Sequence, residues 1–87
     1  MQITNGADYG LRGLLYLAKQ PPGRLVVASE IAAAEEMPEY FFSKIFQNLA
    51  RAGLVNSVRG SSGGFSLARP AADITMREAI EAIEGPI

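Results

Sequence analysis

Apolar residues recur every three or four positions over the first twenty residues, which is the spacing of one buried face of a helix. They are Ala7, Leu11, Leu14, Leu15 and Ala18. Thr4 or Asn5 can cap this predicted helix, and the Pro-Pro-Gly run at 21–23 ends it. Gly10 and Gly13 lie inside it and each costs about 1 kcal/mol relative to Ala, so we expect another backbone to approach closely there.

The middle of the chain predicts a helix-turn-helix after a short strand at 24–27. A short alanine-rich helix over 28–35 buries Ile31. A second helix over 38–52 has Pro38 in its first turn and ends before Gly53. Its predicted buried stripe consists of Phe41, Phe42, Ile45, Phe46 and Leu49.

The last third predicts a hairpin and a final helix. Strands at 54–58 and 65–68 are joined by a glycine-rich loop at 60–64. Thr75 and Glu78 have the spacing of a capping box, which opens a helix that runs to about residue 84. The predicted order is helix, strand, helix, helix, strand, strand, helix. We therefore expect one domain over 1–87, mainly α with a small β-hairpin, in the arrangement of a winged helix-turn-helix.

The amino-acid composition argues against most enzyme mechanisms. None of the 87 residues is a cysteine or a histidine. The chain thus lacks a disulfide framework, a thiolate nucleophile, an imidazole base and the usual zinc or cluster ligands, and we expect no enzyme and no metal site. No apolar run approaches the roughly 18 residues that span a membrane, and the N-terminus does not resemble a signal peptide, so we expect a soluble cytoplasmic protein.

Charge is unevenly distributed along the chain. The net charge is −1, but residues 40–72 contain four basic residues and no acidic one. The basic residues are Lys44, Arg51, Arg59 and Arg69. A cationic segment that spans the second helix of the pair and the hairpin is consistent with binding to nucleic acid, although four charges over this length also suit an ordinary solvated surface.

Two sets of polar residues are candidates for DNA contact. On the helix, Tyr40, Ser43, Lys44, Gln47 and Arg51 are spaced by three or four and share one face. We expect the first four to contact bases or nearby phosphates and Arg51 to contact the DNA backbone. In the hairpin, we expect contacts from Arg59, Ser61, Ser62 and Gly63.

Other uses of these residues are less consistent with the sequence. A phosphate-binding P-loop needs a Gly-Lys-Ser/Thr run that opens a helix, whereas the loop at 60–64 has no lysine and leads into a strand. Glu35, Glu36 and Glu39 could bind a hard cation, but acidic residues at a helix end are usually solvated. The alternative to DNA binding is a winged-helix module for protein–protein contact, which would use the Phe-rich helix and a Glu81/Glu84 face.

The whole chain resembles the Rrf family of bacterial winged-helix regulators. The motif SVRGSSGGFSLARP at 57–70 is the most specific part, supported by YGLR at 9–12 and LARAGLV at 49–55. The resemblance implies a dimeric transcription factor, in some members a repressor, that binds palindromic double-stranded DNA operators. It also implies that the helix over 38–52 enters the major groove and that the wing at 57–68 contacts the minor groove or phosphates.

Several positions depart from the family pattern. Val27 stands where the family has a small polar residue that caps the helix, Glu36 where it has a glycine in the turn, and Pro38 where it has a serine. Ser43 and Lys44 stand where some relatives have Glu and Gln. In the family, the chain continues past the position of Ile87 into a cysteine-bearing loop and a dimer-forming helix. We therefore expect no cofactor in this chain. An iron–sulfur cluster would require cysteines from a longer protein.

Overall fold

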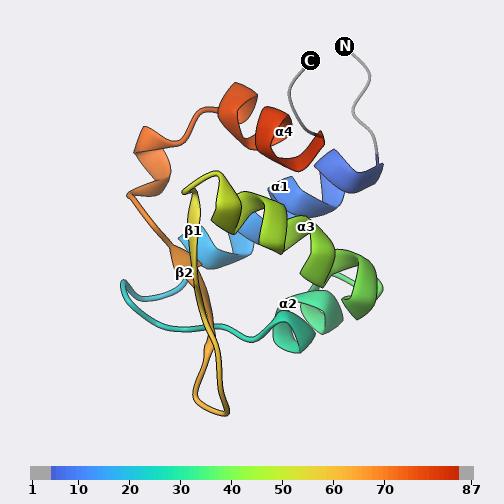
Figure 1. Ribbon diagram of the computed structural model, residues 1–87, viewed down its shortest axis with the longest axis vertical. Helices are drawn as coiled ribbons and strands as arrows, with labels where there is room; N and C mark the ends of the chain where they lie inside the picture. Colours follow the sequence, from blue (N-terminus) through green and yellow to red (C-terminus); the bar gives the residue numbers. More distant parts are fainter. Residues whose placement is uncertain (1–4, 85–87) are drawn as a thin grey trace.

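The computed structural model describes residues 5–84, which form helices around one core and a hairpin that projects from it (Figure 1). The hairpin strands are antiparallel, with Val55 opposite Leu67 and Val58 opposite Gly64. This arrangement confirms the predicted winged helix-turn-helix. The elements are α1 Asn5–Ala18, α2 Ala28–Ala34, α3 Glu39–Arg51, β1 Val55–Val58, β2 Gly64–Leu67, the 3-10 turn η1 Ala71–Asp73 and α4 Met76–Glu84.

Helix α1 buries a different face from the predicted one. Leu15 is 61% exposed and Ala18 is also exposed, whereas Leu17 is buried. The buried positions follow a line that passes through a glycine: Ala7, Gly10, Leu14 and Leu17. The sequence pattern missed this line because a glycine does not count as an apolar position. The predicted cap at Thr4 lies outside the described residues.

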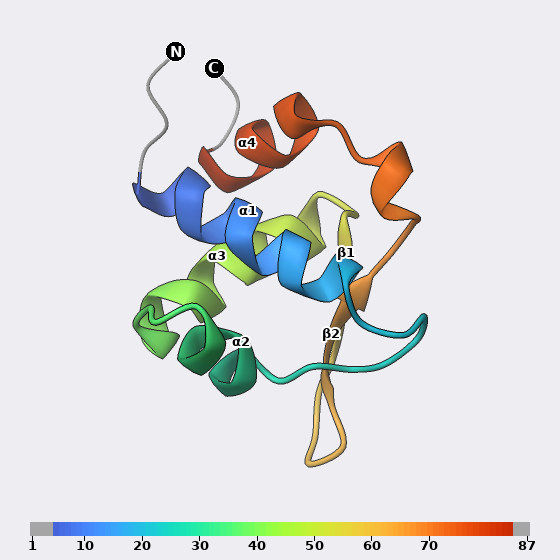
Figure 2. The same ribbon diagram turned by 180° about the vertical axis from the view of Figure 1, so that it is seen from behind.

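Gly10 and Gly13 of α1 make room for side chains, and the expected backbone approach was wrong. A Cβ at Gly13 would lie 2.6 Å from ring atoms of both Phe42 and Phe46 on α3. At Gly10 it would lie 2.9 Å from Cγ1 of Ile83 on α4. Small residues therefore let α1 pack closely against α3 and α4, which lie along it in Figure 2.

Helix α3 supplies the centre of the core. Phe42, Phe46 and Leu49 are fully buried, and the rings of Phe42 and Phe46 are 4.3 Å apart. Phe46 also meets Phe65 of β2 edge to face at 5.1 Å, so the helix and the hairpin base are in direct contact. Phe41 was wrongly predicted to be buried. It is 40% exposed because it lies one position outside the buried stripe.

The predicted strand at 24–27 is reduced to one residue. Val26 donates its N–H to Phe65 O at 2.9 Å and accepts from Phe65 N–H at 2.8 Å, and its side chain is fully buried. β2 thus has β1 on one edge and Val26 on the other. This bridge ties the segment before α2 to the hairpin.

The capping box forms as predicted and orders the start of α4. The Glu78 N–H donates to Thr75 Oγ1 at 3.0 Å, and the Thr75 N–H donates to Glu78 Oε1 at 3.1 Å. Arg69 also donates to Glu78, at 2.6 Å, and the two donors lower the pKa of that carboxyl group. Arg69 therefore has a structural partner at the end of the hairpin.

Three positions of the helix-turn-helix carry residues that do not suit their local backbone or cap role. Glu36 has φ of +54°, a left-handed conformation that favours glycine. Val27 occupies the N-cap of α2 and makes no side-chain cap bond. Pro38 is the N-cap of α3, one position before the predicted first turn, and it also makes no cap bond. The family departures at these positions therefore leave strain or unmade bonds in the helix-turn-helix.

Replacing Glu36 with glycine should stabilise the fold. The left-handed conformation costs an L-residue about 1–2 kcal/mol, and the greater freedom of glycine in the unfolded chain offsets part of the gain. We expect Glu36→Gly to raise the free energy of unfolding by about 0.5–1 kcal/mol in urea titrations. Glu35→Gly is the control, because Glu35 has φ of −100° and should gain nothing. Equal effects of the two variants would contradict this account of the turn.

Adding a cap to α2 should also stabilise it. Val27→Thr keeps the side-chain shape and adds a hydroxyl that can accept from the first-turn N–H groups, worth about 1 kcal/mol. The thermal midpoint should rise by several degrees, as expected for about 1 kcal/mol in a domain of this size. The control is Val58→Thr, which makes the same chemical change at a similarly exposed valine in β1. No rise for Val27→Thr, or the same rise for both, would count against the cap.

Candidate nucleic-acid interface

The polar residues predicted on the second helix do share one solvent-facing side of α3. Tyr40 is 84% exposed, Lys44, Gln47 and Arg51 are exposed, and Ser43 is half-buried. The buried stripe of α3 fixes this orientation, because turning the polar side inward would expose its phenylalanines. We call these five residues, Tyr40, Ser43, Lys44, Gln47 and Arg51, the recognition face.

The hairpin carries the second set of predicted residues at its tip, residues 59–63. Arg59, Ser61 and Ser62 are exposed, and the Gly63 N–H donates to Gly60 O at 3.0 Å to close the turn. Gly63 is buried, and a Cβ there would overlap the Val58 carbonyl group. The absence of a side chain at Gly63 is therefore required by the hairpin itself. We refer to residues 59–63 as the wing tip.

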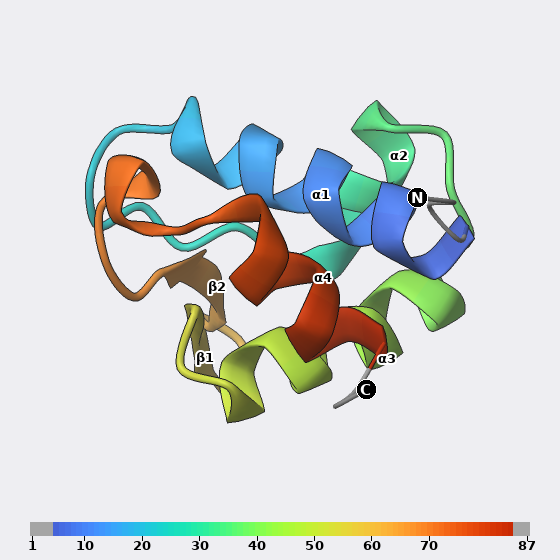
Figure 3. The same cartoon turned by 90° about the horizontal axis from the view of Figure 1, so that it is seen from above.

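Helix α3 and the hairpin lie on the same side of the molecule. Seen from above, α3 and β1 lie along one edge and α1 lies along the opposite one (Figure 3). The wing tip projects away from the body at the end opposite α4 (Figures 1 and 2). A long ligand that meets α3 can therefore extend along the wing as well.

Ion pairing separates the basic residues into two groups. Four arginines bind acidic partners 2.6 to 3.2 Å away, in the pairs Arg12–Asp8, Arg24–Glu30, Arg69–Glu78 and Arg77–Glu81. Within residues 5–84, the other four basic residues form no ion pair: Lys19, Lys44, Arg51 and Arg59. Lys19 directly follows α1, and the other three lie on α3 and at the wing tip. The unpaired cations on α3 and at the wing tip are free to neutralise an anionic ligand.

Arg51 has a more acidic setting than the rest of the recognition face. It lies in the last turn of α3 and lines an open groove together with Glu78, Glu81 and Glu84 of α4. Asn48 donates to Ile83 O at 3.5 Å across the same junction. Arg51 thus shares its groove with three acidic residues, and a phosphate contact by Arg51 stays a prediction.

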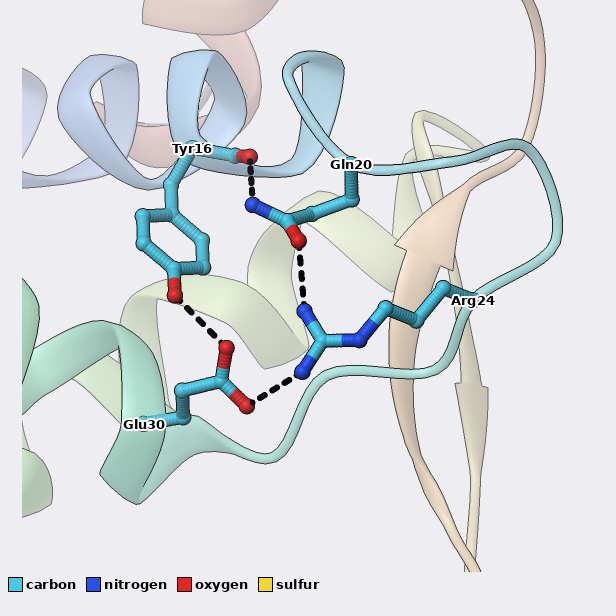
Figure 4. A network of polar contacts seen from close by, with 4 residues as sticks. All are labelled: Tyr16, Gln20, Arg24 and Glu30. Atoms are coloured by element: carbon cyan, nitrogen blue, oxygen red, sulfur yellow. Dashed lines mark hydrogen bonds and ion pairs between the residues drawn. The ribbon is translucent and has the colours of Figure 1, made fainter.

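A partly exposed polar network connects α1 to the start of α2 (Figure 4). Tyr16 donates to Glu30 at 2.6 Å, and Arg24 donates to the other Glu30 oxygen at 2.9 Å and to Gln20 at 2.5 Å. The two donors lower the pKa of Glu30, and the hydrogen bond to the carboxylate raises the pKa of Tyr16. At neutral pH the network therefore contains an anionic Glu30, a cationic Arg24 and a neutral Tyr16.

Sequence reasoning missed two features of this region. Phe41 is an exposed aromatic residue on α3, and its ring meets Tyr9 of α1 edge to face at 5.6 Å. The Tyr16–Glu30 bond joins residues 14 apart in the chain. Helical periodicity gives no signal for either contact, because each depends on how two helices cross.

The described residues do not supply an iron or cluster site. Over residues 5–84, no group of three or more His, Cys, Asp and Glu side chains is placed to hold a metal ion, and the sequence has no cysteine or histidine. Nor does this part of the chain contain a helix long and apolar enough to cross a membrane.

A helix-turn-helix followed by a hairpin, with unpaired cations on both, defines a winged-helix DNA-binding domain. Comparison with known proteins identifies the family. A family model described as Rrf2, iron-dependent transcriptional regulator, matches residues 3–87. The chain belongs to the Rrf2 family of transcriptional regulators.

Solved structures agree with this assignment. CymR, the global cysteine regulator of B. subtilis, is 32% identical with a TM-score of 0.90, over 100% of this chain and 67% of that one. A transcriptional regulator from Listeria innocua is 34% identical with a TM-score of 0.91, over 99% and 60%. IscR from T. potens is 32% identical with a TM-score of 0.86, over 98% and 62%. The chain thus spans about two thirds or less of these proteins.

Proposed function

We propose that this chain is the sequence-specific DNA-binding domain of a bacterial transcriptional regulator. α3 enters the major groove through its recognition face, and the wing contacts the minor groove or phosphates. The observation that carries the proposal is that Lys44 on α3 and Arg59 on the wing form no ion pair within the described residues, and that strand β1 of the wing lies along the same edge of the molecule as α3.

The recognition face has the chemistry to read bases. Lys44 can donate to guanine O6 and N7, and the Gln47 amide can pair with adenine N6 and N7. Tyr40, almost fully exposed near the start of α3, can reach bases or phosphates. Arg59 lies at the end of a narrow hairpin, so its guanidinium group can enter the minor groove or bind DNA phosphates.

The wider protein acts, in this proposal, as a cytoplasmic homodimer on a palindromic operator, and operator occupancy represses transcription. Membership in a family of transcriptional regulators supports this picture. One module neutralises few phosphates and contacts one half-site, so the 87-residue chain alone binds weakly. No cofactor is assigned to its residues.

The alternative, a protein–protein module that docks through the Phe-rich helix and the Glu81/Glu84 face, has less support. Of the three phenylalanines on α3, Phe41 is exposed. Phe42 and Phe46 are fully buried and cannot dock a partner without unfolding the core. The direct experiment is selection of duplexes from a random pool by the chain, followed by titration of the selected duplex at several salt concentrations. Phosphate binding requires affinity to fall as salt rises, and a flat salt dependence would favour the alternative.

Removing the wing-tip arginine should weaken binding. We expect Arg59→Ala to cost about 1–3 kcal/mol of binding free energy and to reduce the salt slope by about one, as for the loss of one groove or phosphate cation. Arg77→Ala is the matched control, because Arg77 is an exposed arginine on α4, whose loss changes the net charge equally. Unchanged affinity for Arg59→Ala, measured at the same salt by fluorescence anisotropy, would remove the wing from the interface.

Changing Lys44 should alter sequence preference as well as affinity. Loss of a base contact relaxes discrimination at one position by about 1–3 kcal/mol, whereas loss of a phosphate contact weakens all duplexes alike. Repeating the selection with Lys44→Ala should therefore relax one position of the selected motif. Arg51→Ala, the expected backbone contact, should leave the motif unchanged. An unchanged motif for Lys44→Ala would make Lys44 a phosphate contact only.

A further inference from the structure

Helix α2 has few interactions of its own to hold it in place. It is seven residues long, it has no side-chain cap, and only Ile31 and Ala32 are buried. Helices this short gain little stability in isolation, so their position depends on tertiary contacts. For α2 those contacts include the polar network centred on Glu30.

The linker segment, residues 24–30, includes the first residues of α2 and is bonded to other elements at Val26 and at Glu30. At its centre, Val26 makes two hydrogen bonds to Phe65 of the wing. At its end, Glu30 accepts from Tyr16 of α1, and Arg24 at the start of the segment binds the same carboxylate (Figure 4). The segment therefore connects the wing, the first helix and the helix-turn-helix.

We propose that Glu30 is a positioning residue for DNA binding: bonded to Tyr16 and Arg24, it fixes α2, and with it the start of α3, relative to the wing. The middle of α3 is held separately by the contact of Phe46 with Phe65. This inference rests on the proposed function, because it concerns how two elements meet one duplex. None of the three side chains needs to touch DNA. Their effect is to keep the recognition face and the wing tip in the relative position at which both make contact.

The physical reason is geometric. When the two DNA-contacting elements belong to one rigid body, both can bind the duplex without further ordering. When they can move relative to each other, that motion must be lost on binding, and the second element adds less to the affinity. Val26 holds the wing side of the linker segment, so loss of the Glu30 bonds would free the α2 side. The penalty should therefore appear only when the wing itself contributes to binding.

Tyr16→Phe is the sharpest variant, because it removes one hydroxyl group and changes no charge near the DNA. On the duplex selected by the wild-type chain, we expect affinity to fall by roughly threefold to tenfold, in the lower part of the range for residues coupled through one network. Glu30→Gln, which keeps the size of the side chain, should have the same effect. Circular dichroism and thermal melting should confirm that each variant is folded at the temperature of the titration.

A double-mutant cycle with Arg59→Ala separates positioning from general stability. If the network aligns the wing, Tyr16→Phe should weaken binding by less than about twofold once Arg59 is absent, because no aligned wing contact remains to be lost. Equal losses in both backgrounds, or no loss in either, would overturn the proposal. If the Tyr16→Phe variant does not fold, the same cycle with Glu30→Gln tests the proposal, with the same expected and contradicting results.

The matched control is Glu81→Gln, which breaks a similar arginine–glutamate pair on α4, at the end of the molecule opposite the wing tip. It should leave affinity within about twofold in both backgrounds. A loss as large as that of Glu30→Gln would overturn the specific role of Glu30. If only this inference fails, the wild-type chain still selects and binds its duplex. If the proposed function fails, the wild-type chain selects no duplex.

Discussion

Burial of the phenylalanine face of α3 is the constraint on which the rest of the structure depends. Phe42 and Phe46 are fully buried, and Gly13 of α1 leaves the space that their rings occupy. Phe46 also contacts Phe65 at the base of the wing. The same packing thus turns the polar side of α3 toward solvent and fixes the hairpin beside it. A side of α3 suited to DNA is a consequence of how its other side is buried.

Features set by local sequence were predictable. The capping box at Thr75 and Glu78, the hairpin and the stripe of α3 depend on residues a few positions apart, and each formed as expected apart from Phe41. The buried face of α1 was misjudged because glycine carries no hydrophobic signal. The strand at 24–27 was reduced to Val26 because only that residue reaches β2.

The candidate site was predictable in its residue types but not in its electrostatics. The sequence marks residues 40–72 as a cationic segment. Only the fold separates Arg69, which Glu78 neutralises, from Lys44 and Arg59, which have no acidic partner among the described residues. The groove that Arg51 shares with three glutamates, and the Tyr16–Glu30 bond, likewise depend on how helices cross. Assignment of individual DNA contacts stays a prediction.

The most direct test of the central claim is chemical-shift mapping by NMR of the chain titrated with its selected duplex. If α3 and the wing form one DNA-binding surface, amide shifts should concentrate at residues 40–47 and 59–63. The exposed side of α4 around Arg77 and Glu81 should stay unperturbed. Shifts confined to α4 or to the exposed Leu15 side of α1, with α3 and the wing unaffected, would contradict the account.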